Sequence, residues 1–114
     1  MSDKKIAQHR ARIRSLNDTF RSTFSGGQIL LTPGVNDLPS DVRAKAMRMV
    51  ATFANFSEDN DPHGEHDFGA FDLSGHKLFW KIDYYGLTLD TGSEDPSDPA
   101  VTTRVLTLML AEEY

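Results

Sequence analysis

Apolar residues near the start of the chain recur at intervals of three and four positions. Between Lys4 and about Arg21 they are Ile6, Ile13, Leu16 and Phe20. This spacing places the apolar side chains on one face of an α-helix, with arginines between them. Residues 25–27 contain two glycines, which favour a turn. The pattern therefore predicts an amphipathic helix over residues 4–21.

A short strand and a second helix are predicted next. Residues 28–32 are rich in leucine and β-branched side chains, and the Pro33-Gly34 pair closes this strand with a turn. Asp37 or Ser40 is suited to cap the helix that follows and that ends near residue 55. The buried stripe of this helix is expected to comprise Val42, Ala46, Met49, Val50 and Phe53.

The clearest local pattern lies between residues 67 and 85. Two aromatic-rich runs flank Ser74-Gly75, a pair that is typical of a two-residue hairpin loop. That loop places Gly69 opposite Trp80, which leaves space for the indole, and places His66 opposite Asp83. Because strand neighbours alternate between faces, a slip of one residue would reverse every facing assignment.

The last third of the chain predicts a long connection and a final helix. Residues 86–99 are acidic and rich in turn formers, with room for a short strand at 87–89. Asp98 and Pro99 form a cap and first-turn pair. The apolar residues after them, which surround much of a helix, are Val101, Val105, Leu106, Leu108, Met109 and Leu110. We therefore expect an α+β fold whose small, mainly antiparallel sheet, built around the hairpin 67–85, is covered on one side by about three helices.

Composition limits the class of protein. The 114 residues, with 39% hydrophobic and 25% charged content, match a single domain spanning residues 1–114. The chain has no cysteine, which excludes thiol catalysis, cysteine-type zinc sites and disulfides. No apolar run has the length of a signal peptide or membrane span, so we expect a cytoplasmic protein without a membrane partner.

The charge is distributed unevenly along the chain. Residues 1–23 carry a net charge of +4, whereas residues 57–99 carry −9. This contrast is compatible with intramolecular attraction, with a nucleic-acid contact, or with docking of a charged partner. The cations are scattered, without a Gly/Arg tract or interleaved aromatics, which argues against nucleic acid. A solvated helix face that balances an acidic loop is the simplest interpretation.

Residues 58–67 combine carboxylates with two imidazoles, which are ligands for divalent metals. The candidate ligands are Asp59, Asp61, His63, His66 and Asp67. The calcium-loop pattern fails, because His63 stands at an oxygen-ligand position and Ala70 at the twelfth position. His63 and His66 with one aspartate would suit zinc, manganese or iron. The alternative is an acidic surface loop whose Asp and Asn side chains cap turns.

A second candidate needs no metal. If His66 faces Asp83, the carboxylate would orient the imidazole as an acid/base pair beside Glu65. The sequence has neither a nucleophile elbow nor a phosphate-binding glycine loop, and cross-strand His–Asp pairs are also ordinary sheet stabilisers. Trp80, Tyr84 and Tyr85 are candidate binding residues. Core packing explains Trp80 better, whereas at least one of the adjacent tyrosines faces outward and suits an interface.

Four segments carry a resemblance to a known family. They are EDNDPHGEHDFGAF at 58–71, FWKIDYY at 79–85, GSEDPSDP at 92–99 and RVLTLMLAEEY at 104–114. With these segments, and with residues 16–18 and 31–35, the chain resembles a bacterial family described only as a domain of unknown function. The resemblance covers nearly the whole chain and implies a stand-alone domain, without implying a mechanism.

Two classes of function follow from these observations. The first is a non-enzymatic module that binds or regulates another protein through its acidic loop and exposed tyrosines. The second is a small enzyme, metal-assisted or based on a His/Asp pair, with a site between residues 59–67 and 83–95. The compact size and the absence of a nucleophile motif favour the first class, and the composition of the acidic loop favours the second.

Overall fold

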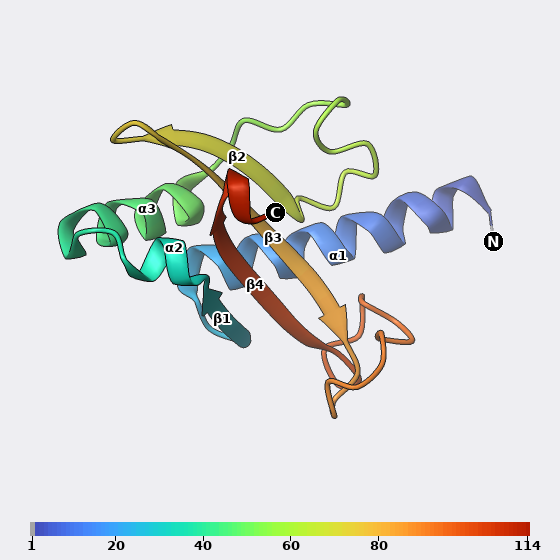
Figure 1. Ribbon diagram of the computed structural model, residues 1–114. Coiled ribbons are helices and arrows are strands. Elements are labelled where there is room, and N and C mark those ends of the chain that lie inside the picture. The colour runs from blue at the N-terminus through green and yellow to red at the C-terminus, as the bar shows by residue number, and fades with distance from the viewer. Residues whose placement is uncertain (1) are drawn as a thin grey trace.

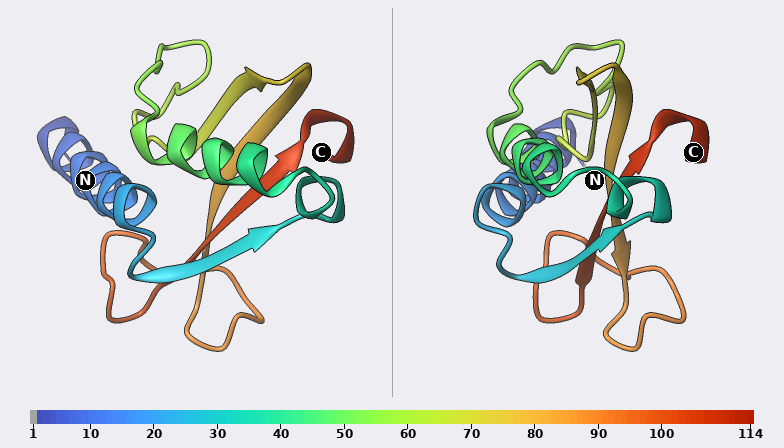
Figure 2. Two further views of the ribbon diagram at one scale, coloured as in Figure 1. Left: turned by 90° about the vertical axis from the view of Figure 1, so that its left-hand side faces the viewer. Right: turned by 60° about the vertical axis from the view of Figure 1, so that its left-hand side comes forward.

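The computed structural model describes residues 2–114 and contains a four-stranded mixed sheet with helices against one face (Figures 1 and 2). The strand order is β1-β4-β3-β2, with β1 parallel to β4 and the other two pairs antiparallel. The predicted α+β class is confirmed. The elements are α1 (Asp3–Thr23), β1 (Gly27–Leu31), α2 (Pro33–Asn36), α3 (Ser40–Thr52), β2 (Phe68–Leu73), β3 (His76–Tyr85), β4 (Thr103–Leu110) and the 3₁₀ turn η1 (Ala111–Glu113).

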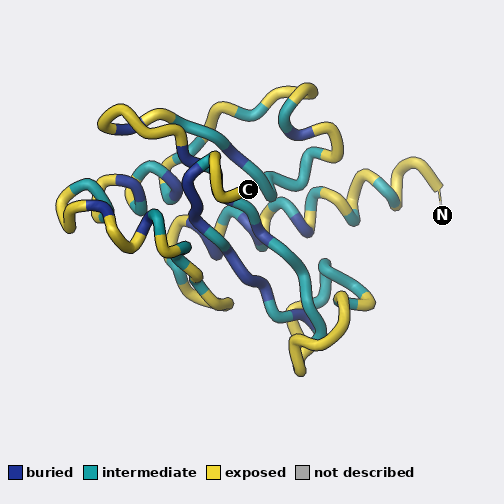
Figure 3. The backbone as a smooth tube through the Cα atoms, viewed as in Figure 1, coloured by how far each residue is buried: buried dark blue, intermediate teal, exposed yellow. Residues whose placement is uncertain are grey.

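Helix α1 confirms the predicted N-terminal helix and has a defined cap at each end. The Ser2 hydroxyl accepts a hydrogen bond from the Lys5 N–H at 3.2 Å, and Phe24 ends the helix in the left-handed conformation. The C-terminal half packs on the sheet, where it buries Ile13 and Phe20. The N-terminal half extends beyond the sheet and is largely exposed (Figure 3).

The predicted final helix is wrong: residues 103–110 form β4, a central strand between β1 and β3. An apolar run that would surround a helix also suits a strand that is covered on both faces. Leu106 and Leu108 face the helices, whereas Val105 and Met109 point to the other face of the sheet, and all four are buried. Asp98 caps a turn, because its carboxylate accepts the Ala100 N–H at 2.9 Å.

The hairpin between β2 and β3 has the predicted register, with Gly69 opposite Trp80 and Phe68 opposite Lys81. Ser74 and Gly75 both have positive φ angles, 53° and 80°, as a two-residue primed turn requires. Glycine is needed at position 69, because a Cβ there would lie 2.3 Å from the Trp80 indole nitrogen. The fully buried Trp80 thus lies across β2 in the centre of the core.

The segment after β3 does not contain the short strand expected at 87–89. Residues 86–92 form a turn closed by a single bridge between Tyr85 and Gly92. Among residues 2–114, no helix is both long and apolar enough to cross a membrane.

Candidate functional site

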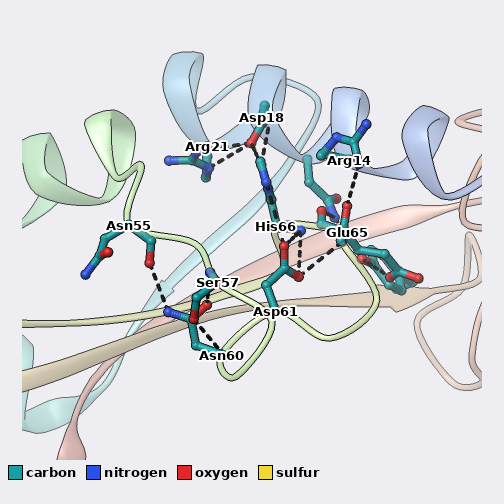
Figure 4. A network of polar contacts seen from close by, with 12 residues as sticks. Arg14, Asp18, Arg21, Asn55, Ser57, Asn60, Asp61, Glu65 and His66 are labelled. Atoms are coloured by element: carbon teal, nitrogen blue, oxygen red, sulfur yellow. Dashed lines mark hydrogen bonds and ion pairs between the residues drawn. The ribbon is translucent and has the colours of Figure 1, made fainter.

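The acidic loop of residues 54–67 is fastened to one side of α1 (Figure 4). Arg14 donates from Nη1 to the Gly64 carbonyl at 3.0 Å, and Asn17 donates from Nδ2 to the Glu65 carbonyl at 3.0 Å. His66 Nδ1 lies 3.0 Å from both carboxylate oxygens of Asp18. Residues three and four positions apart share a helix face, so α1 presents these polar groups to the loop together.

His66 is enclosed by groups from three segments. Its ring stacks on Phe56 with the centroids 3.7 Å apart and the planes at 2°. The second ring nitrogen, Nε2, lies 3.7 Å from an oxygen of Asp61. The guanidinium carbon of Arg21 lies 5.2 Å from the centroid of the Phe56 ring. Arg21 Nη2 also pairs with an Asp18 oxygen at 3.0 Å. Both nitrogens of His66 therefore face carboxylates of the protein itself.

Asp61 shapes the loop from within. Its Oδ1 accepts hydrogen bonds from the backbone N–H groups of Glu65 and His66, at 3.1 and 3.2 Å. Asn60 similarly accepts the Ser57 N–H at 2.8 Å and donates to the Asn55 carbonyl at 2.9 Å. These are the turn-capping bonds that short polar side chains make in loops. Asp61, one of the five candidate metal ligands, thus holds the backbone of the loop.

The five candidate metal ligands are not assembled into a site. Within the part of the chain that the structure describes, no group of three His, Asp or Glu side chains is arranged to hold a metal ion. Asp59 and His63 are exposed at the loop surface, whereas Asp61 is buried. Burial, and then the nearby Glu65 carboxylate, raise the pKa of Asp67.

The expected pair of His66 and Asp83 is wrong, although the hairpin register is correct. His66 has a φ of 55°, which takes the chain out of the strand before β2 begins and turns the imidazole toward α1. Asp83 instead pairs with Lys81 Nζ at 2.9 Å on the sheet face away from the helices, and this hydrogen bond raises the pKa of Lys81. The third proposed catalytic residue, Glu65, accepts a hydrogen bond from Tyr84 at 2.9 Å.

A second polar network lies under α1. The Tyr84 hydroxyl accepts from Asn17 Nδ2 at 2.7 Å, and Asn17 Oδ1 accepts from Arg104 Nε at 2.7 Å. Burial raises the pKa of Tyr84 far above the usual range, which keeps the phenol protonated and able to donate to Glu65. Tyr84 therefore has a place in the interior, on the same sheet face as the buried Trp80.

Sequence reasoning missed the partners that α1 and β4 supply to these networks. They are Asn17, Asp18, Arg21 and Arg104. The available signal was the run of polar residues at positions 14, 17, 18 and 21, which share one side of a helix. The charge of Arg104 within an otherwise apolar strand was a second signal.

The two halves of the proposed cleft, residues 59–67 and 83–95, meet where the Tyr84 hydroxyl donates to Glu65 at 2.9 Å, but none of three cavities in residues 2–114 is lined by both halves. The acidic loop and the segment after β3 lie on different sides of α1 (Figure 1). The latter segment is joined to α1 by His9 Nε2 and Asp95 Oδ1, 2.9 Å apart. The Ser97 hydroxyl, and then His9, lower the pKa of Asp95 to about 2.

Residues 86–92, which we call the leucine loop, are held by their own backbone. Gly86 N–H donates to the Thr91 carbonyl at 2.9 Å, and Leu89 N–H donates to the Gly86 carbonyl at 3.1 Å. The side chains of Leu87 and Leu89 are 65% and 40% exposed. Leu89 also has a φ of 66°, a conformation that is strained for a bulky side chain. Tyr85, at the base of this loop, lies on the sheet face away from the helices.

Comparisons with known proteins give a family without an activity. A family model described as Protein of unknown function (DUF3768) matches residues 31–113. The match contains the acidic loop and the leucine loop but begins after α1, so it is shorter than the resemblance expected over nearly the whole chain. No curated protein matches, and no solved structure matches.

Proposed function

The chain belongs to the family Protein of unknown function (DUF3768), and because that description assigns no activity, we propose its function from its own geometry. The protein is a non-enzymatic binding module that docks onto another protein through Tyr85 and the leucine loop. The proposed surface retains Tyr85 from the tyrosine interface expected from the sequence, but its centre is at Leu87 and Leu89.

The observation that carries the proposal is Leu89, an exposed apolar side chain on a strained backbone. A leucine with positive φ is less stable than glycine or asparagine at the same position. Burial in the folded protein offsets only part of this cost, since Leu89 remains 40% exposed. Strain of this kind persists at functional sites that use the side chain for another purpose, and contact with a partner is such a purpose.

The charge around the leucine loop indicates the kind of partner. Residues 86–100 contain Asp90, Glu94, Asp95 and Asp98 and no lysine or arginine. Glu94 and Leu87 also border a shallow cavity of about 270 Å³. A partner of matching chemistry has an apolar groove for the leucines and lysine or arginine side chains around it, which steer association and fix the orientation.

The enzymatic alternative has less support. The Asp83 carboxylate forms an ion pair with Lys81, and both ring nitrogens of His66 face carboxylates. A general base needs a ring nitrogen within reach of a substrate. Three cavities in residues 2–114 are lined by other residues, and neither His66 nor Asp83 borders any of these three.

A site-specific crosslink tests the proposal. A photoreactive phenylalanine analogue replaces Leu87, and in a matched control it replaces Leu30, an equally apolar side chain that is 51% exposed on β1. We expect one dominant crosslinked protein from position 87 and none of that mass from position 30. Equal products from both positions would show nonspecific adhesion and would contradict the proposal.

The crosslinked protein is then purified and its affinity is measured with three variants. We expect the double variant Leu87→Ser/Leu89→Ser to bind at least about tenfold more weakly, because two apolar side chains lose their buried contact. Leu30→Ser should bind like the wild type. Glu94→Gln should reduce the association rate and its salt dependence. Unchanged affinity of the double variant would overturn the assignment.

A further inference from the structure

We propose that a cavity beside Arg104, at the C-terminal half of α1, binds a small organic carboxylate. The site is separate from the leucine loop, and the proposal does not depend on the protein-binding function. It rests on a buried cation without a carboxylate partner and on an open cavity that the same cation borders.

Arg104 is 3% exposed, which is rare for a charged side chain that has no ion pair. Among residues 2–114, no carboxylate oxygen lies within 4.0 Å of its guanidinium. Its hydrogen-bond acceptors are neutral: Nε donates to Asn17 Oδ1 at 2.7 Å, and Nη2 donates to the Pro96 carbonyl. Burying a charge costs free energy that neutral acceptors offset only in part, so the site favours an added anion.

The remaining nitrogen of Arg104 is available to that anion. Nη1 has no hydrogen-bond acceptor in the described residues. It is not fully enclosed either, because the Trp80 nitrogen is the one fully buried side-chain nitrogen or oxygen in these residues that lacks a hydrogen-bond partner. Arg104 lines the cavity, and we infer that Nη1 is the donor that faces it. The Tyr84 ring, 5.2 Å from the guanidinium carbon, covers another face of the group and holds it in place.

The cavity has a volume of about 200 Å³, and its lining residues come from α1, from the turn before β1 and from the chain around the start of β4. Figure 2 shows these three parts of the backbone near one another. Leu16, Phe20 and Pro99 supply apolar walls. Thr19 and Ser25 border the same space, and among residues 2–114 neither hydroxyl makes a hydrogen bond. An anion in the cavity would thus meet one cation, two hydroxyl donors and an apolar wall.

These features select the class of ligand. Arginine recognises carboxylates and phosphates through paired N–H groups. The cavity is smaller than the roughly 300–1,000 Å³ that accommodates drug-sized ligands, which disfavours a nucleotide. The apolar wall favours a carboxylate with a short hydrocarbon chain over inorganic phosphate, which has no apolar part to bury. A four-carbon acid such as butyrate is a suitable probe.

The first experiment titrates the full chain with sodium butyrate at constant ionic strength. Nitrogen–proton correlation spectra follow the Arg104 Nε–H and the backbone amides of Thr19 and Ser25. We expect saturable shifts of these signals with butyrate and none with the neutral amide butyramide. Equal shifts with butyramide would show that the cation plays no part, and no saturable shift with butyrate would overturn the proposal.

Inorganic phosphate is the second probe, and it separates a carboxylate site from a general anion site. Shifts with phosphate that are absent with butyrate would overturn the carboxylate assignment. We expect phosphate to bind at least about tenfold more weakly than butyrate, because the apolar wall then contributes nothing.

Two variants locate the site. Arg104→Gln should abolish the response to butyrate, although loss of its bonds to Asn17 also threatens folding. Thr19→Phe is the second variant. Thr19 is exposed at the rim, so the larger phenylalanine side chain would fill the cavity without removing the hydrogen bonds between Arg104 and Asn17. The matched control is Ser15→Phe, one turn earlier on an exposed part of α1. Binding that survives in Thr19→Phe, or that is lost equally in Ser15→Phe, would contradict the assigned position.

Discussion

The acidic loop of residues 54–67 and the leucine loop of residues 86–92 lie on different sides of α1 and are built in opposite ways. In the acidic loop, polar side chains turn inward and bind backbone groups, as Asp61 and Asn60 do. In the leucine loop, backbone bonds close the turn and leave two apolar side chains in solvent. The comparison shows that a concentration of ionisable residues can serve structure, and it is the exposed apolar turn that we propose as the recognition surface.

The largest expected effect is on the acidic loop. Asp61→Ala removes the acceptor of two backbone N–H groups and should lower the free energy of unfolding by about 2–3 kcal/mol. Urea denaturation of the variant and the wild type measures this difference. Asp59→Ala, at an exposed carboxylate of the same loop, is the control and should stay within about 0.5 kcal/mol of the wild type. Equal losses would mean that the loop is not held by Asp61.

His66→Ala should have the next largest effect, a loss of about 1–2 kcal/mol, because both the Phe56 stack and the Asp18 hydrogen bond disappear. Thermal unfolding reports the change. The exposed His63 provides a matched control, since His63→Ala removes the same type of side chain from the same loop. A stable His66→Ala protein would indicate that the imidazole is kept for chemistry and not for attachment to α1.

In the leucine loop, we expect a substitution that increases the free energy of unfolding. Leu89→Asn should raise the free energy of unfolding by about 0.5–1 kcal/mol, because asparagine tolerates a positive φ better than leucine. Leu87→Asn makes the same chemical change without a positive φ and should bring no such gain. Chemical denaturation distinguishes the two. A loss of stability in Leu89→Asn would mean that the Leu89 side chain contributes packing to the fold.

The smallest effect is the pH dependence at the contact between α1 and the segment after β3. The folded-state pKa of Asp95 is lowered to about 2, well below that of a free aspartate, so its contribution is present above about pH 4 and is lost as the pH falls toward 2. Asp95→Asn should therefore lose less stability than the wild type between pH 5 and pH 2.5. Denaturation curves at both pH values provide the measurement, and parallel losses in the two proteins would contradict the prediction.

Part of the site could be read from local sequence and part could not. Turn chemistry at Ser74-Gly75 predicted the hairpin register, because a two-residue loop admits a single alignment of its flanking residues. The same register could not predict where His66 points, because a positive φ just before β2 depends on Asp18 and Phe56, which are distant along the chain. Arg104 was likewise recognisable as unusual, but its burial followed from the central position of β4.

By itself, the sequence determined the two long helices, the hairpin and its register, and the acidic and apolar character of the loops, since these depend on residues within a few positions of each other. Only the tertiary structure decided that residues 103–110 are a strand, that His66 binds α1, and that Leu87 and Leu89 remain exposed. The physical reason is that an apolar run suits a helix or a central strand equally well until β1 and β3 supply its hydrogen-bond partners.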